Sequence, residues 1–334
     1  MTGPLTAVDM HTGGEPLRIV TSGFPDLPKG TILEKRAFVR DHLDHLRKAL
    51  MFEPRGHADQ YGALLVEPDL PEADLAVLFM HNEGYSTMCG HAIIALGRYA
   101  VDQGLVPANG DSAIVNIECP CGLVRAEVSI RDGKPADVAF ESVPSFLFDR
   151  DCTVERESGP QIRFDIAYGG AFYALADAGQ FGLEFGHDPV ASFVQAADAL
   201  TRAVKRAFPL THPDAADLAF LYGSILTDGR DQWSDAPTRN ICVFADRQVD
   251  RSPTGSGVTA RLAAMHARGQ ISLGQTRTFE SVIGSRFLGS VASKTSAGSH
   301  AAITARVSGR AYYTGRTEFM IEADDPLADG FLVR

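Results

Sequence analysis

The chain has 334 residues, of which 45% are hydrophobic and 22% are charged. This length and composition are typical of a globular protein with one large domain or two lobes of about 150 residues each. The net charge of −11 argues against nucleic acid as a partner, because binding to backbone phosphates needs a clustered basic surface. No run of about 18 consecutive apolar residues occurs, so no membrane-spanning helix is expected.

The N-terminal residues lack both the basic patch and the apolar core of a signal peptide, so the expected compartment is the cytoplasm. Cysteines are sparse and odd in number for a chain of this length. Such a set predicts reduced thiols rather than a disulfide framework. The five cysteines are Cys89, Cys119, Cys121, Cys152 and Cys242.

Strand-like segments bounded by Gly, Pro, Asp and Asn recur through the first half of the chain. The first, residues 5–10, leads through the turn His11-Thr12-Gly13-Gly14 into the second, residues 17–21. A helix is expected across residues 39–51, where apolar residues fall at helical spacing among charges. The other expected strands of this half are residues 62–67, 75–80, 113–118 and 123–130.

The second half of the chain repeats this layout loosely. Residues 164–176 contain a strand-like run, a second Gly-Gly pair and another strand-like run. Each Gly-Gly pair is followed, at a similar distance, by a turn that leads into an apolar helix. Cys89 lies at the first of these turns, 75 residues after Gly14. Thr254 lies at the second, 84 residues after Gly170.

Both helices are apolar on nearly every side, which is typical of buried helices. The first is expected to run from Gly90 to a terminal glycine, Gly104. The second is expected to run from Gly255 to Gly269. A weak twofold internal repeat is the economical interpretation, and two unrelated strand–helix units are the alternative.

The predicted fold class is α+β, with two pseudo-symmetric lobes that each wrap a strand-rich sheet around one buried helix. The first lobe is expected to comprise residues 1–145 with the C-terminal segment 320–334, and to carry Cys89. The second is expected to comprise residues 146–319 and to carry Thr254.

Cys89 stands immediately before the first of these helices, in the sequence Met88-Cys89-Gly90-His91. Unpaired backbone N–H groups and the positive end of the helix dipole converge at such a position. They raise the thiolate fraction of a cysteine, and Gly90 lets a ligand approach the backbone closely. The alternative is a buried structural cysteine, since cysteine is among the commonest interior residues.

Thr254 places a hydroxyl residue where the repeat places Cys89, at the start of the second helix. If the two helix N-termini face each other, their N–H groups form an anion site suited to a carboxylate. Backbone donors to that carboxylate make the α-proton of a bound acid more acidic, which is what proton abstraction needs most. The alternative for Thr254 alone is an ordinary N-cap residue in a turn.

His91 and Asp250 are the polar candidates beside these helix starts. A neutral histidine accepts a hydrogen bond from an ammonium group or donates one to a hydroxyl. Asp250 offers a carboxylate to a positively charged secondary amine. The alternatives are a hydrogen-bonded core histidine and a capping aspartate. Loop-holding roles are expected for the residues near turns, His11, Glu15, Arg55 and His57.

The sequence offers no metal or cofactor motif. Cys119-Pro120-Cys121 lies in a strand-like run and lacks the spacing, or a second cysteine pair, for zinc. The run Gly255-Ser256-Gly257 lacks the third glycine of a dinucleotide fingerprint, and no Walker loop or His-Glu-x-x-His pattern occurs. We therefore expect neither a metal nor a cofactor.

At these residues the chain resembles the proline racemase family, whose fold is similar to that of diaminopimelate epimerase. The resemblance runs almost from end to end, and its most specific part is the pair of helix-start motifs, 165 residues apart (89 to 254). It implies a barrel-like sheet around each central helix, catalysis without a cofactor, and a homodimer. The matching segments are residues 9–18, 53–57, 88–91, 250–257, 281–287, 309–315 and 330–331.

Racemases and 2-epimerases of this family use two cysteines, one on each face of the α-carbon, and this chain has Thr254 in place of the second. A threonine hydroxyl is far less acidic than a thiol, so two-base inversion is not expected, whereas deprotonation by Cys89 is retained. The Cys/Thr pair is similar to that of the trans-3-hydroxy-L-proline dehydratase branch. This implies a lyase that removes the 3-hydroxyl and forms Δ1-pyrroline-2-carboxylate.

The resemblance also implies a role for seven residues. The catalytic pair is Cys89 and Thr254; the amides of Gly90, His91, Gly255 and Ser256 hold the carboxylate of the imino acid; Asp250 and His91 contact its ring nitrogen. The proton for the leaving oxygen has four alternative donors: Thr254, His91, a bound water and the newly protonated Cys89. The alternative functions are a 2-epimerase of hydroxyproline or proline, and a non-catalytic imino-acid-binding protein.

Overall fold

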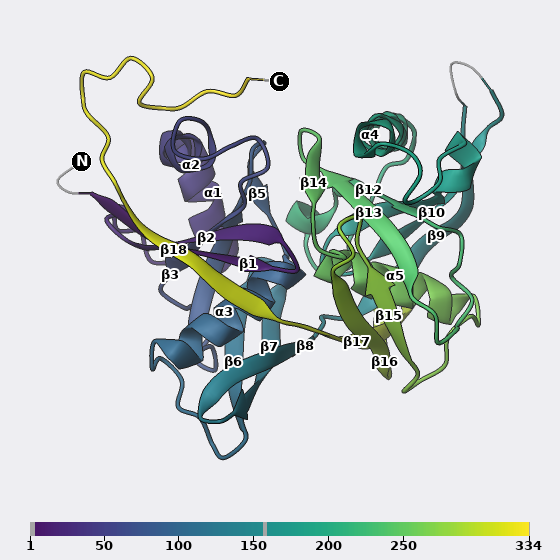
Figure 1. Cartoon of the computed structure of the whole chain (residues 1–334), viewed down its shortest axis with the longest axis horizontal. Coiled ribbons are helices and arrows are strands. Elements are labelled where there is room, and N and C mark those ends of the chain that lie inside the picture. Colours follow the sequence, from purple (N-terminus) through teal and green to yellow (C-terminus); the bar gives the residue numbers. More distant parts are fainter. Residues whose placement is uncertain (1–3, 156–158, 334) are drawn as a thin grey trace. The chain divides into compact units, whose positions relative to one another are not determined.

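The computed structural model describes residues 4–155 and 159–333 of the chain. They divide into two compact units, residues 1–138 with 310–334 and residues 139–309. The first division lies seven residues before the expected one (138 against 145). The second lies ten residues before it (309 against 319), because strand β18 (Ala311–Phe319), expected in the second lobe, pairs along its length with β1 (Leu5–Thr12) in the first unit. Figure 1 shows the yellow strand β18 beside the purple strand β1.

The first unit is built on strands that pair in the order β18, β1, β2, β3, β4, β6, β7. The pairs β2–β3 and β4–β6 are parallel, and the others are antiparallel. Strand β8 (Lys134–Glu141) crosses the division between the units. The remaining elements are β2 (Glu15–Ser22), α1 (Ile32–His42), α2 (Asp44–Met51), β3 (Gly62–Val66), β4 (Leu75–Met80), β5 (Tyr85–Ser86), α3 (Gly90–Asp102), β6 (Ser112–Cys119) and β7 (Gly122–Arg131).

The second unit has the pairing order β9, β10, β11, β12, β13, β15, β16, β17. Strand β17 also pairs with β9, which closes this sheet into a barrel of eight strands. The elements are β9 (Ser145–Val154), β10 (Ile162–Tyr168), β11 (Phe172–Asp177), η1 (Ala178–Phe181), α4 (Val190–Ala207), η2 (Ala216–Leu218), β12 (Leu221–Thr227), β13 (Thr238–Phe244), β14 (Gln248–Asp250), α5 (Gly255–Ala267), β15 (Thr276–Glu280), β16 (Arg286–Ala297) and β17 (His300–Gly309).

The internal repeat is visible in the order of strand pairing. From β18 to β7 in the first unit, successive strand pairs are antiparallel, antiparallel, parallel, antiparallel, parallel and antiparallel. The second unit has the same order of pairs from β9 to β16. The short strand before each central helix, β5 or β14, pairs antiparallel with β4 or β13. The expected α+β class, with pseudo-symmetric strand-rich lobes, is confirmed.

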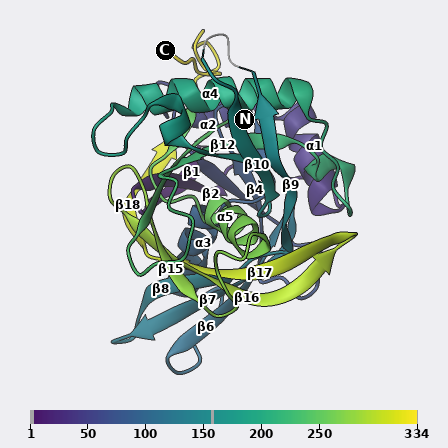
Figure 2. The same cartoon turned by 90° about the vertical axis from the view of Figure 1, so that its right-hand side faces the viewer.

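One helix forms the core of each unit. Helix α3 packs against β1, β2, β6, β7 and β18, and α5 packs against β9, β10, β16 and β17. Figure 2 shows α5 surrounded by the strands of its unit. The glycines expected to end these helices, Gly104 and Gly269, follow the C-cap residues and have positive φ angles of 71° and 70°. A residue without Cβ suits this left-handed position.

The structure corrects two local predictions. The single helix expected across residues 39–51 is two helices, because the backbone turns at Leu43 (φ −126°, ψ 14°) and α2 restarts at Asp44, whose carboxylate pairs with Arg47 at 2.6 Å. Cys119-Pro120-Cys121 does not lie inside a strand: Cys119 ends β6, and the next two residues form the turn to β7. Within residues 4–155 and 159–333, no helix is long and apolar enough to cross a membrane.

Candidate active site

The first predicted cluster lies at the start of α3, in the first unit. Cys89 is the N-cap residue, with an extended backbone (φ −146°, ψ 106°), and its side chain does not cap the helix. The thiol is buried, with 5% of the residue exposed. The amides of Gly90 and His91 occupy the first turn, where backbone N–H groups have no partner within the helix. The cluster therefore places a thiol beside two backbone donors.

His91 lies directly against this thiol, with 3.0 Å between His91 Nδ1 and Cys89 Sγ. Burial lowers the pKa of His91 to about 3, and a hydrogen bond with the Pro16 backbone only partly opposes this. The ring of Tyr61 stands edge-on to the imidazole, 5.0 Å away. The Thr12 hydroxyl donates to the His91 carbonyl at 2.8 Å and ties the Gly-Gly turn to the helix. The imidazole is thus neutral and fixed at neutral pH.

The second predicted cluster lies at the start of α5, in the second unit, and follows β14. The Asp250 carboxylate accepts a hydrogen bond from the Ser252 amide at 2.7 Å, and the Ser252 hydroxyl accepts one from the Thr254 amide at 3.1 Å. Asn240 donates to the Pro253 carbonyl at 3.1 Å. These bonds fix the five-residue path from the strand into the helix.

Thr254 ends this path in a conformation that costs energy. Its φ of 65° and ψ of 96° lie in a region that a β-branched residue rarely adopts, and such backbone strain typically costs about 1–3 kcal/mol. The side chain does not cap α5. Its hydroxyl is buried and acts on the Asp250 carboxyl, whose pKa it lowers, rather than on the amides of the helix. Thr254 therefore does not behave as an ordinary N-cap residue.

Asp250 is a buried carboxyl group, with 3% of the residue exposed. Burial raises its pKa to about 6, and the Ser252 and Thr254 side chains and the Arg251 charge limit the rise. No described arginine or lysine forms an ion pair with it, so the carboxylate is available to a cation bound at the start of α5.

The first turn of α5 is packed tightly against β11 and the second Gly-Gly turn. The Ser256 hydroxyl lies 2.7 Å from the hydroxyl of Tyr173, and both side chains are buried. Gly169 approaches so closely that a Cβ there would lie 2.3 Å from the Ser256 carbonyl oxygen. Gly255 opens the helix beside Thr254. The Gly-Gly turn thus contacts the first turn of the central helix in both units.

The seven predicted residues therefore form two clusters, one in each unit: Cys89, Gly90 and His91 at the start of α3, and Asp250, Thr254, Gly255 and Ser256 at the start of α5. Sequence reasoning missed Tyr173, Thr12 and Tyr61, which support these clusters. The sequence could have indicated Tyr173 and Thr12, because Thr12 directly precedes the first Gly-Gly pair and Tyr173 closely follows the second. It could not have indicated Tyr61, since only the folded chain brings it to His91.

Within the described part of the chain, no group of three or more His, Cys, Asp or Glu side chains is placed to hold a metal ion. Cys119 and Cys121 lie close to each other, and burial raises the pKa of Cys119 well above its usual range. A protonated thiol is a poor metal ligand.

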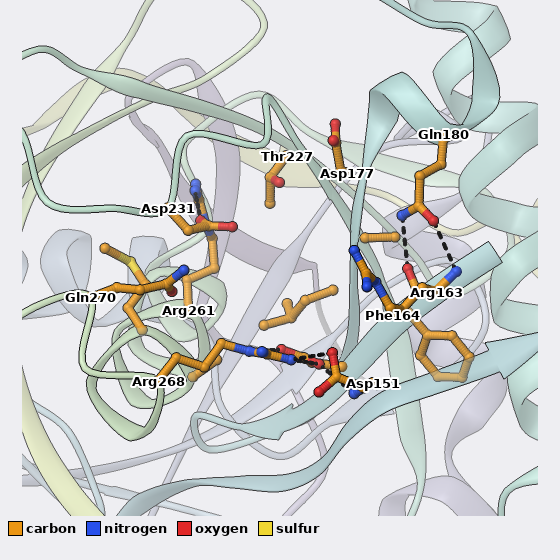
Figure 3. A pocket seen from close by; sticks show the side chains of 15 residues that line it. Asp151, Arg163, Phe164, Asp177, Gln180, Thr227, Asp231, Arg261, Arg268 and Gln270 are labelled. Carbon is orange, nitrogen blue, oxygen red and sulfur yellow. Dashed lines mark hydrogen bonds and ion pairs between the residues drawn. The ribbon is translucent and has the colours of Figure 1, made fainter.

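A pocket of about 260 Å³ opens beside the C-terminal half of α5, within the second unit (Figure 3). Several charged side chains that line this pocket form ion pairs with one another. Arg268 pairs with Asp165 at 2.6 Å and with Asp151 at 3.0 Å. Arg261 pairs with Asp231 at 2.6 Å. None of the seven predicted residues is among the described residues that line it. It is therefore separate from both helix starts.

The comparison with known proteins covers nearly the whole chain. A family model described as proline racemase matches residues 7–332. A Xenopus tropicalis protein named trans-L-3-hydroxyproline dehydratase is 57% identical over 335 residues, which cover 99% of this chain and 96% of that protein. The Homo sapiens protein named trans-3-hydroxy-L-proline dehydratase is 54% identical over 338 residues, with coverage of 100% and 96%.

The fold agrees with that of a solved relative. The structure of a hydroxyproline epimerase from Agrobacterium vitis, with bound trans-4-OH-L-proline, matches with a TM-score of 0.93 at 29% identity and covers 99% of this chain and 95% of that one. Because the family model and both relatives span almost every described element, the chain belongs to the proline racemase family.

Proposed function

We propose that this protein dehydrates trans-3-hydroxy-L-proline to Δ1-pyrroline-2-carboxylate, as a hydro-lyase. The observation that carries the proposal is the asymmetry of the two helix starts: a buried thiol, Cys89, at α3 and a buried hydroxyl, Thr254, at the equivalent position of α5. Two relatives that are 57% and 54% identical over nearly their full length carry the name of this activity.

The chemistry begins with removal of the α-proton by the Cys89 thiolate. The amides of Gly90, His91, Gly255 and Ser256 hold the carboxylate and stabilise the negative charge that develops on it. Backbone donors at helix N-termini suit this role, because they are already oriented when the charge appears. His91 and Asp250 bind the ring nitrogen of the substrate. The buried carboxylate of Asp250, with which no described arginine or lysine forms an ion pair, suits a secondary ammonium group.

Thr254 decides between elimination and inversion. Inversion needs a second acid on the other face of the α-carbon, with an acidity near that of a thiol. A threonine hydroxyl cannot supply it at neutral pH, so the carbanion loses the 3-hydroxyl instead of gaining a proton on the opposite face. Thr254 is buried and has a strained backbone, which are features of functional positions rather than of ordinary helix caps.

The test is a panel of five imino acids scored separately for inversion and for loss of water: proline, two 4-hydroxyproline isomers and both 3-hydroxyproline isomers. We expect loss of water from trans-3-hydroxy-L-proline, detected as the pyrroline product. Efficient inversion of 4-hydroxyproline without loss of water from the 3-hydroxy substrate would assign the chain to the epimerases. Binding without any α-hydrogen exchange would point to a binding protein.

We further propose that the enzyme is a cytoplasmic homodimer that works without a cofactor. All five cysteines are free thiols, a state that a reducing compartment maintains. Light scattering after size exclusion tests the dimer, and cell fractionation tests the compartment. Activity that survives exhaustive dialysis against a chelator supports catalysis without a metal, and activity restored only by an added metal would contradict it.

A further inference from the structure

The stereochemistry of the proposed substrate restricts which group can protonate the departing oxygen. In trans-3-hydroxy-L-proline the 3-hydroxyl lies on the ring face opposite the carboxylate. The α-hydrogen also lies opposite the carboxylate, so the α-hydrogen and the 3-hydroxyl share one face. A base that removes the α-hydrogen therefore stands on the face from which the hydroxide leaves.

The surroundings of Cys89 determine where the abstracted proton stays. The nearest ring nitrogen is His91 Nδ1, at 3.0 Å from the sulfur. Burial lowers the pKa of His91 to about 3, far below that of a thiol, so this imidazole does not take the proton over. Cys89 and His91 are only 5% and 2% exposed, so exchange of the thiol proton with water is slow compared with a single elimination step, although it accumulates over many cycles of deprotonation and return. The proton therefore remains on the sulfur.

We propose that the Cys89 sulfur carries the α-proton to the leaving 3-hydroxyl, acting first as the base and then as the acid, while His91 holds the thiol in place; this rests on the proposed function. His91 is then a positioning residue in this step. The second unit is not needed to supply an acid.

The step balances without another reactant. The Cα–H bond breaks, its proton moves to sulfur, and its electron pair stays on Cα, delocalised into the carboxylate. The C3–O bond then breaks, its electron pair leaves with the oxygen, and the sulfur-bound proton turns that hydroxide into water. A Cα=C3 double bond forms and Cys89 returns to the thiolate. Transfer of a proton from nitrogen to C3, through solvent, completes the tautomerisation to the pyrroline.

Cis-3-hydroxy-L-proline tests the proposal with the unmodified enzyme, because it has the same α-hydrogen and carries the hydroxyl on the other face. We expect α-hydrogen exchange in deuterated water, measured by NMR, and dehydration at least about 100-fold slower than that of the trans isomer, the usual loss when an acid catalyst is absent. Comparable dehydration of both isomers would overturn the proposal. Failure of wild-type enzyme to dehydrate the trans isomer would instead overturn the proposed function.

If cis-3-hydroxy-L-proline shows no exchange of its α-hydrogen, the pH profile of kcat for the trans isomer tests the proposal instead. If Cys89 is both the base and the acid, it needs to be ionised only at the start of each turnover, because it then receives the proton of the substrate. The rate should therefore rise as Cys89 ionises and then stay level to about pH 9. A separate acid gives a falling limb, which would overturn the proposal. Among the described titratable groups, His91 lies against Cys89, and Cys119 is close enough for the Cys89 charge to raise its pKa. His91 is neutral above about pH 4, and burial keeps Cys119 protonated, so neither changes charge in this range.

His91→Asn separates positioning from binding. Loss of the 3.0 Å contact frees the thiol to turn away from the oxygen. Both reactions should lose activity, because His91 is also proposed to bind the ring nitrogen that the two substrates share. We expect kcat for trans-3-hydroxy-L-proline to fall by about a further tenfold beyond the loss in α-hydrogen exchange of L-proline, which has no 3-hydroxyl to protonate. Equal losses in both reactions would mean that His91 serves only substrate binding or folding, and would contradict its positioning role.

Discussion

Gly169 lies against the first turn of α5 at a distance that admits no side chain: a Cβ on Gly169 would stand 2.3 Å from the Ser256 carbonyl oxygen and 2.6 Å from the Ala260 amide nitrogen. Both neighbours are backbone atoms of a buried helix, so neither can move independently. The Gly-Gly turn therefore sets the position of the helix start that carries Thr254.

Gly169→Ala should consequently destabilise the protein and impair catalysis together. We expect a loss of about 1–3 kcal/mol in the free energy of unfolding, the usual cost of overpacking a core, measured by urea denaturation. The matched control is Gly315→Ala in β18, where an added Cβ would have no neighbour within 4 Å. Equal stability of the two variants would mean that α5 shifts freely, against the packing described here.

Cys89→Ser should abolish both α-hydrogen exchange and dehydration, because a serine hydroxyl is far less acidic than a thiol and does not ionise near neutral pH. We expect a fall of about 1,000-fold or more in kcat. Cys152→Ser is the control: this cysteine lies on β9, and burial raises its pKa to about 12, so it stays protonated. A Cys89→Ser variant that still exchanges the α-hydrogen would assign the base to another residue.

Thr254→Cys should shift the enzyme from elimination toward inversion, since it restores an acidic group at the start of α5. Chiral chromatography of L-proline and trans-4-hydroxy-L-proline after incubation measures the gain. We expect detectable inversion where the wild type shows none, with reduced dehydration of the 3-hydroxy substrate. Thr254→Ser, which keeps the hydroxyl, should show no inversion. Absence of any gain in the cysteine variant would contradict the role given to this position.

Asp250→Asn should stabilise the folded protein at neutral pH. Burial raises the pKa of Asp250 to about 6 from the ordinary aspartate value of 3.8. The stability that Asp250 contributes is therefore present below about pH 4 and is lost as the pH rises through 6. The shift corresponds to about 3 kcal/mol. Asparagine is neutral and still accepts the Ser252 hydrogen bond, so its advantage should appear between pH 4 and 7.

Thermal unfolding across this pH range measures the effect. The difference in Tm between variant and wild type should be small near pH 4 and should grow to its maximum above pH 7. The same substitution should raise KM, because the carboxylate proposed to bind the ring nitrogen is gone. A Tm difference that does not vary with pH would mean that Asp250 has an ordinary pKa in the folded protein.

The sequence predicted the elements whose signals are local. Strands β1, β2, β4 and β6 appear where alternating or apolar runs are bounded by turn residues. The ends of β4 are as predicted, and those of the other three differ by no more than two residues. Helix α4 was missed, although buried residues recur along it at helical spacing, at Phe193, Ala197, Leu200 and Val204. The capping box of Thr31 and Glu34, which starts α1, was also a readable signal.

The sequence by itself determined that two apolar helices start at a thiol and at a hydroxyl, because caps, glycines and hydrophobic periodicity are properties of neighbouring residues. It also carried the family resemblance that the comparisons bear out. Tertiary structure alone decided the state of those groups. The low pKa of His91, the raised pKa of Asp250 and the strained backbone of Thr254 come from burial and from strands distant in sequence. Solvent exclusion and long-range packing are set by the fold, so no local pattern reports them.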